Sequence, residues 1–205
     1  MPRSRATLRA VTGPAAEHRI GAVVLAGGGA ARLGGVDKAS IEVGGRTLLE
    51  HVLAALADVT EVVVVGSEVP TSRPVTFTRE DPTGGGPAAG LLAGLRAFAR
   101  VPDIVVVLAV DMPRVSAQTV RRLLDAADHD GAVLIDASGR QQYLCAAYSV
   151  AGLVGAAPGS EGGHGLAMRG LVSGLRLAEV PVTGDESRDL DTWEDLADLR
   201  EAFGE

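Results

Sequence analysis

The sequence is short of cysteine, aromatic residues, positive charge and long apolar runs. The single cysteine, Cys145, excludes an intramolecular disulfide and fits the reducing cytoplasm, where we expect the protein to work. No apolar run approaches the roughly 20 residues that cross a bilayer, so we expect no membrane partner. Lys and Arg number 19 against 26 Asp and Glu, and the net charge of −7 argues against the broad basic surface that binds nucleic acid. A nucleotide stays open as a ligand, because a local cluster of cations and backbone amides can hold one.

The composition favours one α/β domain behind a short leader. At 205 residues the chain suits a single domain of ordinary size, and 46% hydrophobic residues allow a packed core. With 3% aromatics and 27 glycines, that core must consist of aliphatic strands and helices joined by tight turns. Residues 1–19 are basic and lack the apolar stretch of a signal peptide. We therefore predict a disordered leader over 1–19 and a single domain over 20–205.

Strand and helix patterns alternate along that domain. Short aliphatic runs predict strands over 20–26, 61–65, 75–78, 103–110, 132–136, 142–149 and 175–182. Apolar residues at helical spacing predict helices over 47–58, 88–100, 116–127 and 192–203. Glycine density predicts a loop over 80–87, and a broken helix with loop over 152–174. Because the connections are short, this order predicts a three-layer α/β/α fold around a mostly parallel central sheet.

A glycine-rich loop follows the first strand. Its glycines let the backbone approach a phosphate chain closely, because no Cβ stands in the way, and Arg32 and Lys38 add two positive charges. Ala39 after the lysine excludes the Walker A loop, and the Rossmann pattern leaves both cations unexplained. A wide turn between strand and helix is the alternative. The nucleotide contacts expected here are Leu25, Ala26, Gly27, Gly28, Gly29 and Lys38.

Aspartates follow two other elements. Asp111 comes at the end of the strand over 103–110, where open parallel sheets bind ligands, and it predicts a ligand for Mg²⁺ on a triphosphate. The alternative is that Asp111 caps the next segment. Asp189 and Asp191 point the same way in an extended stretch before the last helix, so one of them can complete the metal site. We assign Asp191 to the metal and leave Asp189 open, since ordinary helix-start chemistry also explains this cluster.

Several of these segments resemble one family. LAGGGAARLGGVDKA is similar to the signature L-A-G-G-x-x-x-R-M/L-G-G-x-D-K of the MobA-like nucleotidyltransferases, and LAVDMP, RDLDTWEDL and EDPTGGGPAAGLLAGL resemble three later family segments. The resemblance implies a Rossmann-like nucleotidyltransferase fold, with Arg32 and Lys38 catalytic, Asp111 a metal ligand and Asp81 beside the base and ribose. Three departures are Ala88 for the usual Leu, Trp193 for Pro, and VVVVGS for VVVxAN.

The resemblance also suggests where the second substrate binds. GRQQYLCAAY is similar to the family's G-R-x-Q-P-L-x-A-x-Y, which lies beside the acceptor, so Arg140 and Gln142 are candidate acceptor contacts. Tyr143 stands where Pro is usual. An exposed turn leading into a strand is the alternative.

The chemistry expected is attack by an acceptor phosphate on the α-phosphorus of an NTP, which releases pyrophosphate. By resemblance the donor is GTP and the acceptor a phosphorylated pterin, molybdopterin carrying molybdenum, with contacts to molybdoenzymes or other proteins of that cofactor pathway. A cytidylyl or other nucleotidyl transferase with a different phosphorylated acceptor, a sugar-1-phosphate nucleotidyltransferase, and a catalytically silent nucleotide-binding module remain as alternatives. No Ser-His-Asp or Cys-His pairing is visible, and Cys145 in its apolar run is expected to be buried and inert.

Overall fold

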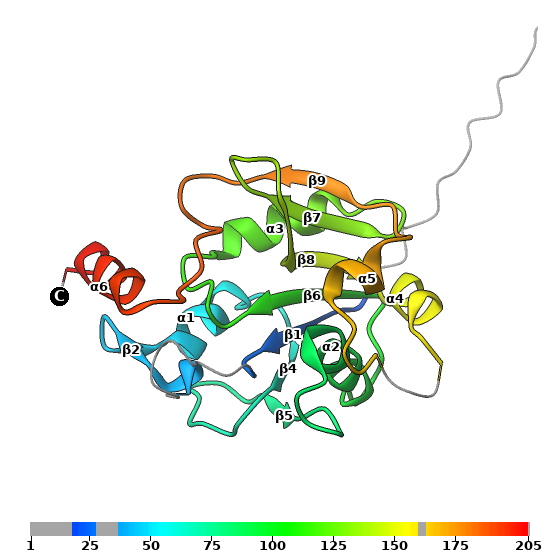
Figure 1. The fold of residues 1–205 in the computed structure, drawn as a ribbon, viewed down its shortest axis with the longest axis horizontal. Helices are drawn as coiled ribbons and strands as arrows, with labels where there is room; N and C mark the ends of the chain where they lie inside the picture. The colour runs from blue at the N-terminus through cyan, green and yellow to red at the C-terminus, as the bar shows by residue number, and fades with distance from the viewer. Residues whose placement is uncertain (1–17, 28–36, 160–162, 205) are drawn as a thin grey trace, which may run out of the picture.

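A seven-stranded sheet runs through the computed structural model, which describes residues 18–27, 37–159 and 163–204. The strand order is β5-β4-β1-β6-β8-β7-β9, from the bottom to the top of Figure 1, and every strand but β8 runs in the same direction. The strands are β1 (Ile20–Leu25), β4 (Glu61–Val65), β5 (Thr76–Thr78), β6 (Ile104–Ala109), β7 (Gly131–Ile135), β8 (Gln141–Ser149) and β9 (Ala178–Pro181).

Helices cover both faces of this sheet, as Figure 1 shows. They are α1 (Leu48–Ala55), α2 (Gly86–Arg96), α3 (Ala117–Ala126), α4 (Val150–Ala156), α5 (Met168–Val172) and α6 (Trp193–Ala202). Alternate strand residues point to opposite faces, so Val24 of β1 packs in the core with α1, α3 and α6, while Val23 packs with α2, α4 and α5. The described residues therefore form three layers, and the predicted fold class is confirmed.

The structure refines several sequence predictions. A tight turn at 136–140 joins β8 to β7 as a hairpin, so β8 runs antiparallel to the other strands. The residue pattern of β8 does not predict this direction. The glycine-dense stretch contains most of α4 and all of α5, and residues 160–162 between them lie outside the described residues. Helix α2 begins two residues earlier than predicted, with Pro87 in its first turn, where a missing N–H costs nothing. Between the glycine-rich loop and α1, the chain forms a 3-10 turn, η2 (Lys38–Ser40), followed by a hairpin of β2 (Glu42–Val43) and β3 (Arg46–Thr47).

Glycine on the packing face of α2 lets the helix backbone lie close to the sheet. A Cβ built on Gly94 would lie 2.8 Å from Val23 Cγ1 and 3.1 Å from Val65 Cγ2. Only glycine therefore lets the helix backbone approach β1 and β4 at this distance. This close packing fixes the start of α2 beside the ends of those two strands.

The continuous sheet supports one domain over 20–205, which stays a prediction. Most of the predicted leader, residues 1–17, lies outside the described residues. Within the described part of the chain, no helix has the length and apolarity needed to span a membrane.

Candidate active site

A cavity opens where the sheet changes its order of connection. From β1 the chain moves outward to β4 and β5, and then crosses to β6 on the other side of β1. In open α/β sheets, ligands bind at the carboxyl ends of the strands at such a point. The cavity has a volume of about 570 Å³, within the range of small-molecule sites. Its described lining is Leu25, Ala26, Gly27, Lys38, Val65, Glu80, Gly84, Gly86, Pro87, Gly90, Ala109, Val110, Asp111 and Leu144.

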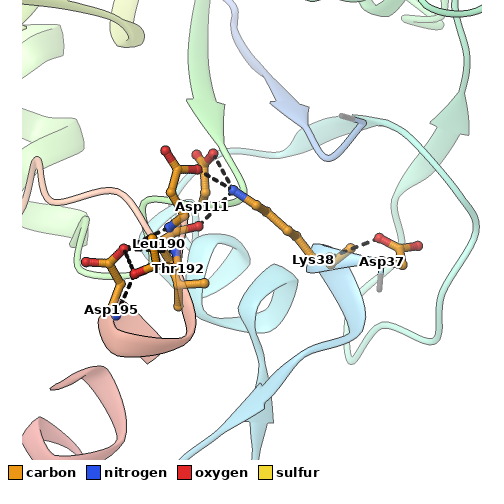
Figure 2. Close-up of polar contacts among 8 residues, drawn as sticks. Asp37, Lys38, Asp111, Leu190, Thr192 and Asp195 are labelled. Carbon is orange, nitrogen blue, oxygen red and sulfur yellow. Dashed lines mark hydrogen bonds and ion pairs between the residues drawn. The ribbon is translucent and has the colours of Figure 1, made fainter. Parts of the chain in front are cut away.

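Lys38 is the only lysine of the chain, and its ammonium joins three segments at this edge of the sheet. Its Nζ lies 3.3 Å from Asp111 Oδ2 and 2.7 Å from Asp191 Oδ1, and donates a hydrogen bond of 2.7 Å to the carbonyl oxygen of Leu190. Figure 2 shows the side chain extended toward Asp111 and Leu190. The lysine side chain is 13% exposed, against 29% for Asp111 and 52% for Asp191. Two carboxylates thus share one shielded cation.

Local structure on both sides of Lys38 holds its backbone in place. The Asp37 carboxylate accepts a hydrogen bond of 3.0 Å from the Ala39 backbone N–H and so caps η2. Ala39 and Ile41 are buried in the core, and Ile41 accepts a backbone hydrogen bond of 2.8 Å from the first residue of α1, Leu48. The lysine therefore begins from an anchored turn and extends its side chain over the end of the sheet.

The segments that carry the two aspartates are also tied together. Val110 donates a backbone hydrogen bond of 3.0 Å to Leu25, which continues the β1–β6 ladder up to Asp111. Leu190 donates one of 2.8 Å to the Asp111 carbonyl, and its side chain is buried. With Leu190 packed inward, the extended backbone directs Asp189 and Asp191 outward. The apolar residue between the two aspartates thus sets their orientation.

Neither Asp111 nor Asp191 serves as a helix cap. Thr192 is the N-cap of α6 and forms a reciprocal capping box with Asp195, and Ser116 forms one at the start of α3. Neighbouring residues therefore cap both helices, and the two aspartate carboxylates interact with Lys38 instead.

Burial and the clustered charges shift three pKa values. Burial lowers the pKa of Lys38, but the hydrogen bond to Asp191 and the charge of Asp111 outweigh it, so the net shift is upward. Burial raises the pKa of Asp111, and Lys38 opposes that rise only in part. Partial burial, followed by the charges of Asp111 and Asp191, raises the pKa of Asp189 to about 6. The clustered carboxylates of this site therefore favour the binding of a further positive charge.

Two carboxylates, rather than three, form the candidate metal-binding pair. Across the described ranges, no three His, Cys, Asp or Glu side chains come together as a group that could hold a metal. Asp189 is close enough for the charges of Asp111 and Asp191 to raise its pKa, but Lys38 forms its hydrogen bonds and ion pairs with Asp111, Leu190 and Asp191 instead. Asp111 and Asp191, which meet at one nitrogen atom, are the two oxygen donors with a common point of convergence.

The glycine-rich loop is described only at its two ends. Leu25, Ala26 and Gly27 line the cavity at the end of β1, and Lys38 closes the loop. The predicted contacts Gly28, Gly29 and Arg32 lie outside the described residues.

The loop before α2 contributes a different carboxylate from the one expected. Asp81 is exposed, and the described lining of the cavity includes its neighbour Glu80 instead. Glu80 Oε1 accepts a hydrogen bond of 3.2 Å from the Gly84 backbone N–H. Neither Glu80 nor Leu144 of β8 carries a signal in the sequence that marks it as cavity lining.

The two predicted acceptor residues lie on the β7–β8 hairpin. Gln142 Nε2 donates a hydrogen bond of 2.8 Å to Asp136 Oδ2, and the Arg140 backbone N–H donates one of 3.0 Å to Asp136 Oδ1. The Arg140 guanidinium is close enough to Asp189 to lower that residue's pKa, against the net upward shift. The charge of Arg140 therefore reaches the site, whereas the amide of Gln142 holds the hairpin turn.

The fold, a mostly parallel sheet between helices with a cavity at its switch point, is that of a nucleotidyltransferase. Residues 22–176 match the MobA-like NTP transferase domain family, and the chain belongs to that family. The chain is 36% identical over 148 residues to the molybdenum cofactor guanylyltransferase of Acidiphilium cryptum, an alignment that covers 67% of this chain and 70% of the relative. The predicted family and enzyme class are confirmed.

Two further likenesses bear on fold and chemistry. A solved nucleotidyl transferase from Methanothermobacter thermautotroptrophicus superimposes with a TM-score of 0.71 at 30% identity, covering 90% of this chain and 97% of that one. The 2-C-methyl-D-erythritol 4-phosphate cytidylyltransferase of Thermus thermophilus is 38% identical over 118 residues, which are 56% of this chain and 53% of the relative. The scaffold is therefore shared by enzymes named for different bases.

Proposed function

We propose that this nucleotidyltransferase transfers GMP from GTP to a phosphorylated pterin acceptor, molybdopterin carrying molybdenum, in a Mg²⁺-dependent reaction that releases pyrophosphate. The observation that carries the proposal is the meeting of Lys38 with Asp111 and Asp191 beside a cavity of about 570 Å³. The cavity is large enough for a nucleoside, and its wall combines apolar side chains with glycine backbone.

The reaction needs little covalent chemistry from the protein. An oxygen of the acceptor phosphate attacks the α-phosphorus of GTP, the bond to the oxygen that bridges the α- and β-phosphates breaks, and pyrophosphate leaves with that oxygen and its electron pair. The attacking oxygen is already anionic, so no general base is required. The contributions expected of the chain are positioning and charge neutralisation.

The described residues divide these tasks by position. Gly27, at the end of β1, offers its backbone to the phosphates, and Lys38 supplies the positive charge that balances theirs. Leu25, Val65 and Pro87 form the apolar wall that suits the ribose and base. Arg140, whose charge lowers the pKa of Asp189 against the net upward shift, is the candidate cation for the phosphate of the acceptor.

The donor set fits a divalent cation. Asp111 and Asp191 converge on one nitrogen atom, and Mg²⁺ takes one or two carboxylates together with phosphate and water oxygens. Bound by these two aspartates, Mg²⁺ would neutralise charge on the α-phosphate and polarise it.

A cytidylyl transferase on another phosphorylated acceptor is the second candidate, favoured by the Thermus relative. The departure from the guanylyltransferase pattern at the end of β4 does not decide between the two candidates. Ser67, which follows Gly66 in VVVVGS, accepts a hydrogen bond of 3.0 Å from Arg79. That contact engages the Ser67 hydroxyl with a neighbouring strand end, so the choice of base rests on other residues.

Pyrophosphate release separates the candidates. The purified chain is incubated with Mg²⁺, molybdenum-loaded molybdopterin and each of the four NTPs in turn. We expect release with GTP only, and a loss of about 100-fold or more in Asp111→Asn, because one preorganised charge contact typically contributes that much. Asp58→Asn, which breaks an exposed ion pair with Arg121, is the matched control and should keep wild-type activity. Turnover with CTP instead would establish the second candidate, and equal turnover by Asp111→Asn would refute the role of Asp111.

A further inference from the structure

A buried polar pair lies behind the segment that carries Asp191. Among the residues that the structure describes, Thr119 and Glu186 are the buried polar side chains, with 0% and 6% exposure, and they bond to each other. Thr119 Oγ1 of α3 donates a hydrogen bond of 2.5 Å to Glu186 Oε2. Glu186 belongs to the connection between β9 and α6, so this contact joins that connection to α3.

The Glu186 carboxylate is fully engaged by its surroundings. Its Oε1 accepts a hydrogen bond of 2.7 Å from the Thr183 backbone N–H and forms an ion pair with Arg122. Arg122 also donates hydrogen bonds to Thr183 Oγ1 and to the carbonyl oxygen of Pro181, at 2.5 and 3.3 Å. One carboxylate and one guanidinium thus fold residues 181–186 against α3.

This network is poorly explained by stability alone. A buried ion pair returns little net free energy, because removing both charges from water costs about as much as their attraction returns. The Arg122 Nε, moreover, is buried without a hydrogen-bond partner among the described residues. An apolar contact between α3 and the connection would stabilise the fold equally well. A buried carboxylate with directional contacts does fix the path of the backbone.

That path leads directly to the active site. Leu190 and Asp191 follow Glu186 at positions 4 and 5 further along the chain. The connection is tied at Val182 to β7, at Glu186 to α3, and at Leu190 to the Asp111 carbonyl. Between Glu186 and Leu190, the only backbone hydrogen bond given by a described N–H is that of Arg188 to Asp185, which is local. Glu186 is therefore the last side chain that ties this connection to α3 before the two oxygens that meet Lys38, and Arg188 between them forms ion pairs with Asp195 and Asp198 of α6.

We propose that Glu186, held by Thr119 and Arg122, is a positioning residue that sets Asp191 and the Leu190 carbonyl against Lys38 and Asp111. The proposal rests on the function proposed above. Glu186 touches no substrate and acts only through the backbone of its connection. None of residues 182–191 lines the cavity. Loss of the anchor should therefore impair the cation-binding carboxylates and leave nucleotide binding intact.

The test compares Glu186→Ala with the conservative Glu186→Gln, whose amide can still bridge Thr119 and the Thr183 N–H. Asp58→Asn is the control, because it breaks an exposed ion pair with Arg121, the residue of α3 that precedes Arg122. Mn²⁺ affinity is measured by electron paramagnetic resonance with GTP and without acceptor, and kcat and KM for GTP are measured at saturating Mg²⁺.

We expect Glu186→Ala to weaken Mn²⁺ binding roughly tenfold, the lower end of what outer contacts of metal ligands contribute, and to lower kcat. KM for GTP should stay within about twofold, because the cavity wall is unaltered, and Glu186→Gln should restore most of the Mn²⁺ affinity. A lower melting temperature with wild-type Mn²⁺ affinity and kcat would reduce Glu186 to a structural residue and overturn the proposal. A rise in KM for GTP as large as the fall in kcat would also overturn the proposal.

A second measurement needs neither metal nor acceptor. Trp193 is the only tryptophan of the chain, follows Asp191 by two positions and is 57% exposed, so its fluorescence anisotropy reports on this segment. Anisotropy should fall in Glu186→Ala and recover in Glu186→Gln, and equal values in all three proteins would overturn the proposal. If the wild-type chain binds no Mn²⁺ or releases no pyrophosphate, the proposed function fails, whereas the anisotropy still decides the role of Glu186.

Discussion

Replacing Lys38 with methionine removes the cation shared by Asp111 and Asp191 and keeps the length of the side chain. The ammonium makes three charge-assisted contacts, and its own side chain is only 13% exposed. A hydrogen bond to a charged group stabilises a protein by about 1.5–3 kcal/mol. Both carboxylates are partly exposed, however, so the stabilisation from each contact falls toward the smaller values measured for ion pairs on the surface. In addition, the contacting carboxylate oxygens lie at 3.3 and 2.7 Å from one Nζ and so within about 6 Å of each other, a separation at which two charges repel by roughly 3 kcal/mol at an effective dielectric constant of about 20 once the cation is gone.

Relief of the buried ammonium's desolvation offsets part of this loss. We therefore expect Lys38→Met to lower the free energy of unfolding by about 2 kcal/mol, which for a chain of this size corresponds to a fall of about 4–8 °C in Tm. Mg²⁺ should raise the Tm of the variant more than that of the wild type, because no ammonium then competes for the two carboxylates.

Differential scanning calorimetry with and without Mg²⁺ measures both effects. Arg46→Met, which removes an exposed cation on β3, serves as the control and should keep the wild-type Tm and Mg²⁺ response. A Lys38→Met protein that melts with the wild type and responds equally to Mg²⁺ would refute the shared-cation interpretation. A response of the variant that is smaller than that of the wild type would show that the ammonium does not occupy the position a divalent cation takes.

Three further predictions concern single groups. After reductive ¹³C-methylation, the sole lysine should give one side-chain resonance with a pKa above 10.5. Because the folded state raises this pKa, the charge of Lys38 should stabilise the fold below pH 10.5, and that contribution should be lost as the pH rises through the folded pKa. Burial raises the pKa of Cys145 to about 12, so the native thiol should resist iodoacetamide at pH 8. The free energy of unfolding should also fall by up to about 1.4 kcal/mol per pH unit above pH 9, because only the thiol of the unfolded chain then ionises. Gly131→Ala should lower the free energy of unfolding by at least about 2 kcal/mol in denaturant titrations, since its φ is 136° and a Cβ there would lie 2.1 Å from Ala147 O, whereas Gly139→Ala, with φ of 80° and open space, should cost less than half as much.

Much of the fold could be predicted because burial leaves a direct trace in the residue pattern. Aliphatic runs such as EVVVV and IVVVLA are buried on both faces and became central parallel strands. The direction of β8 left no such trace, since a strand has the same alternation whichever way it runs. The start of α2 was also missed, because Gly and Pro read as loop although both are tolerated in the first turn of a helix.

The candidate site divides in the same way. Lys38 and Asp111 could be singled out from the sequence because each follows a recognisable element with a chemically suitable side chain. The choice of Asp191 over Asp189 could not be settled, since both face outward on one extended segment. The structure adds the distinction that Asp191 contacts Lys38 while Asp189 keeps a raised pKa nearby. The anchoring role of Glu186 had no sequence signal at all, because a buried carboxylate looks like a surface one until its partners are known.

The sequence alone determined the layers and the strands, because hydrophobic periodicity acts over neighbouring residues, whereas the phosphate-binding role of the loop after β1 stays a prediction. Only the tertiary structure decided which charges meet. Lys38 is separated from Asp111 by 73 positions and from Asp191 by 153, and its ammonium reaches both because parallel strands bring their carboxyl ends to one edge of the sheet. Contacts over such separations depend on how complete elements pack, which no local pattern of residues encodes.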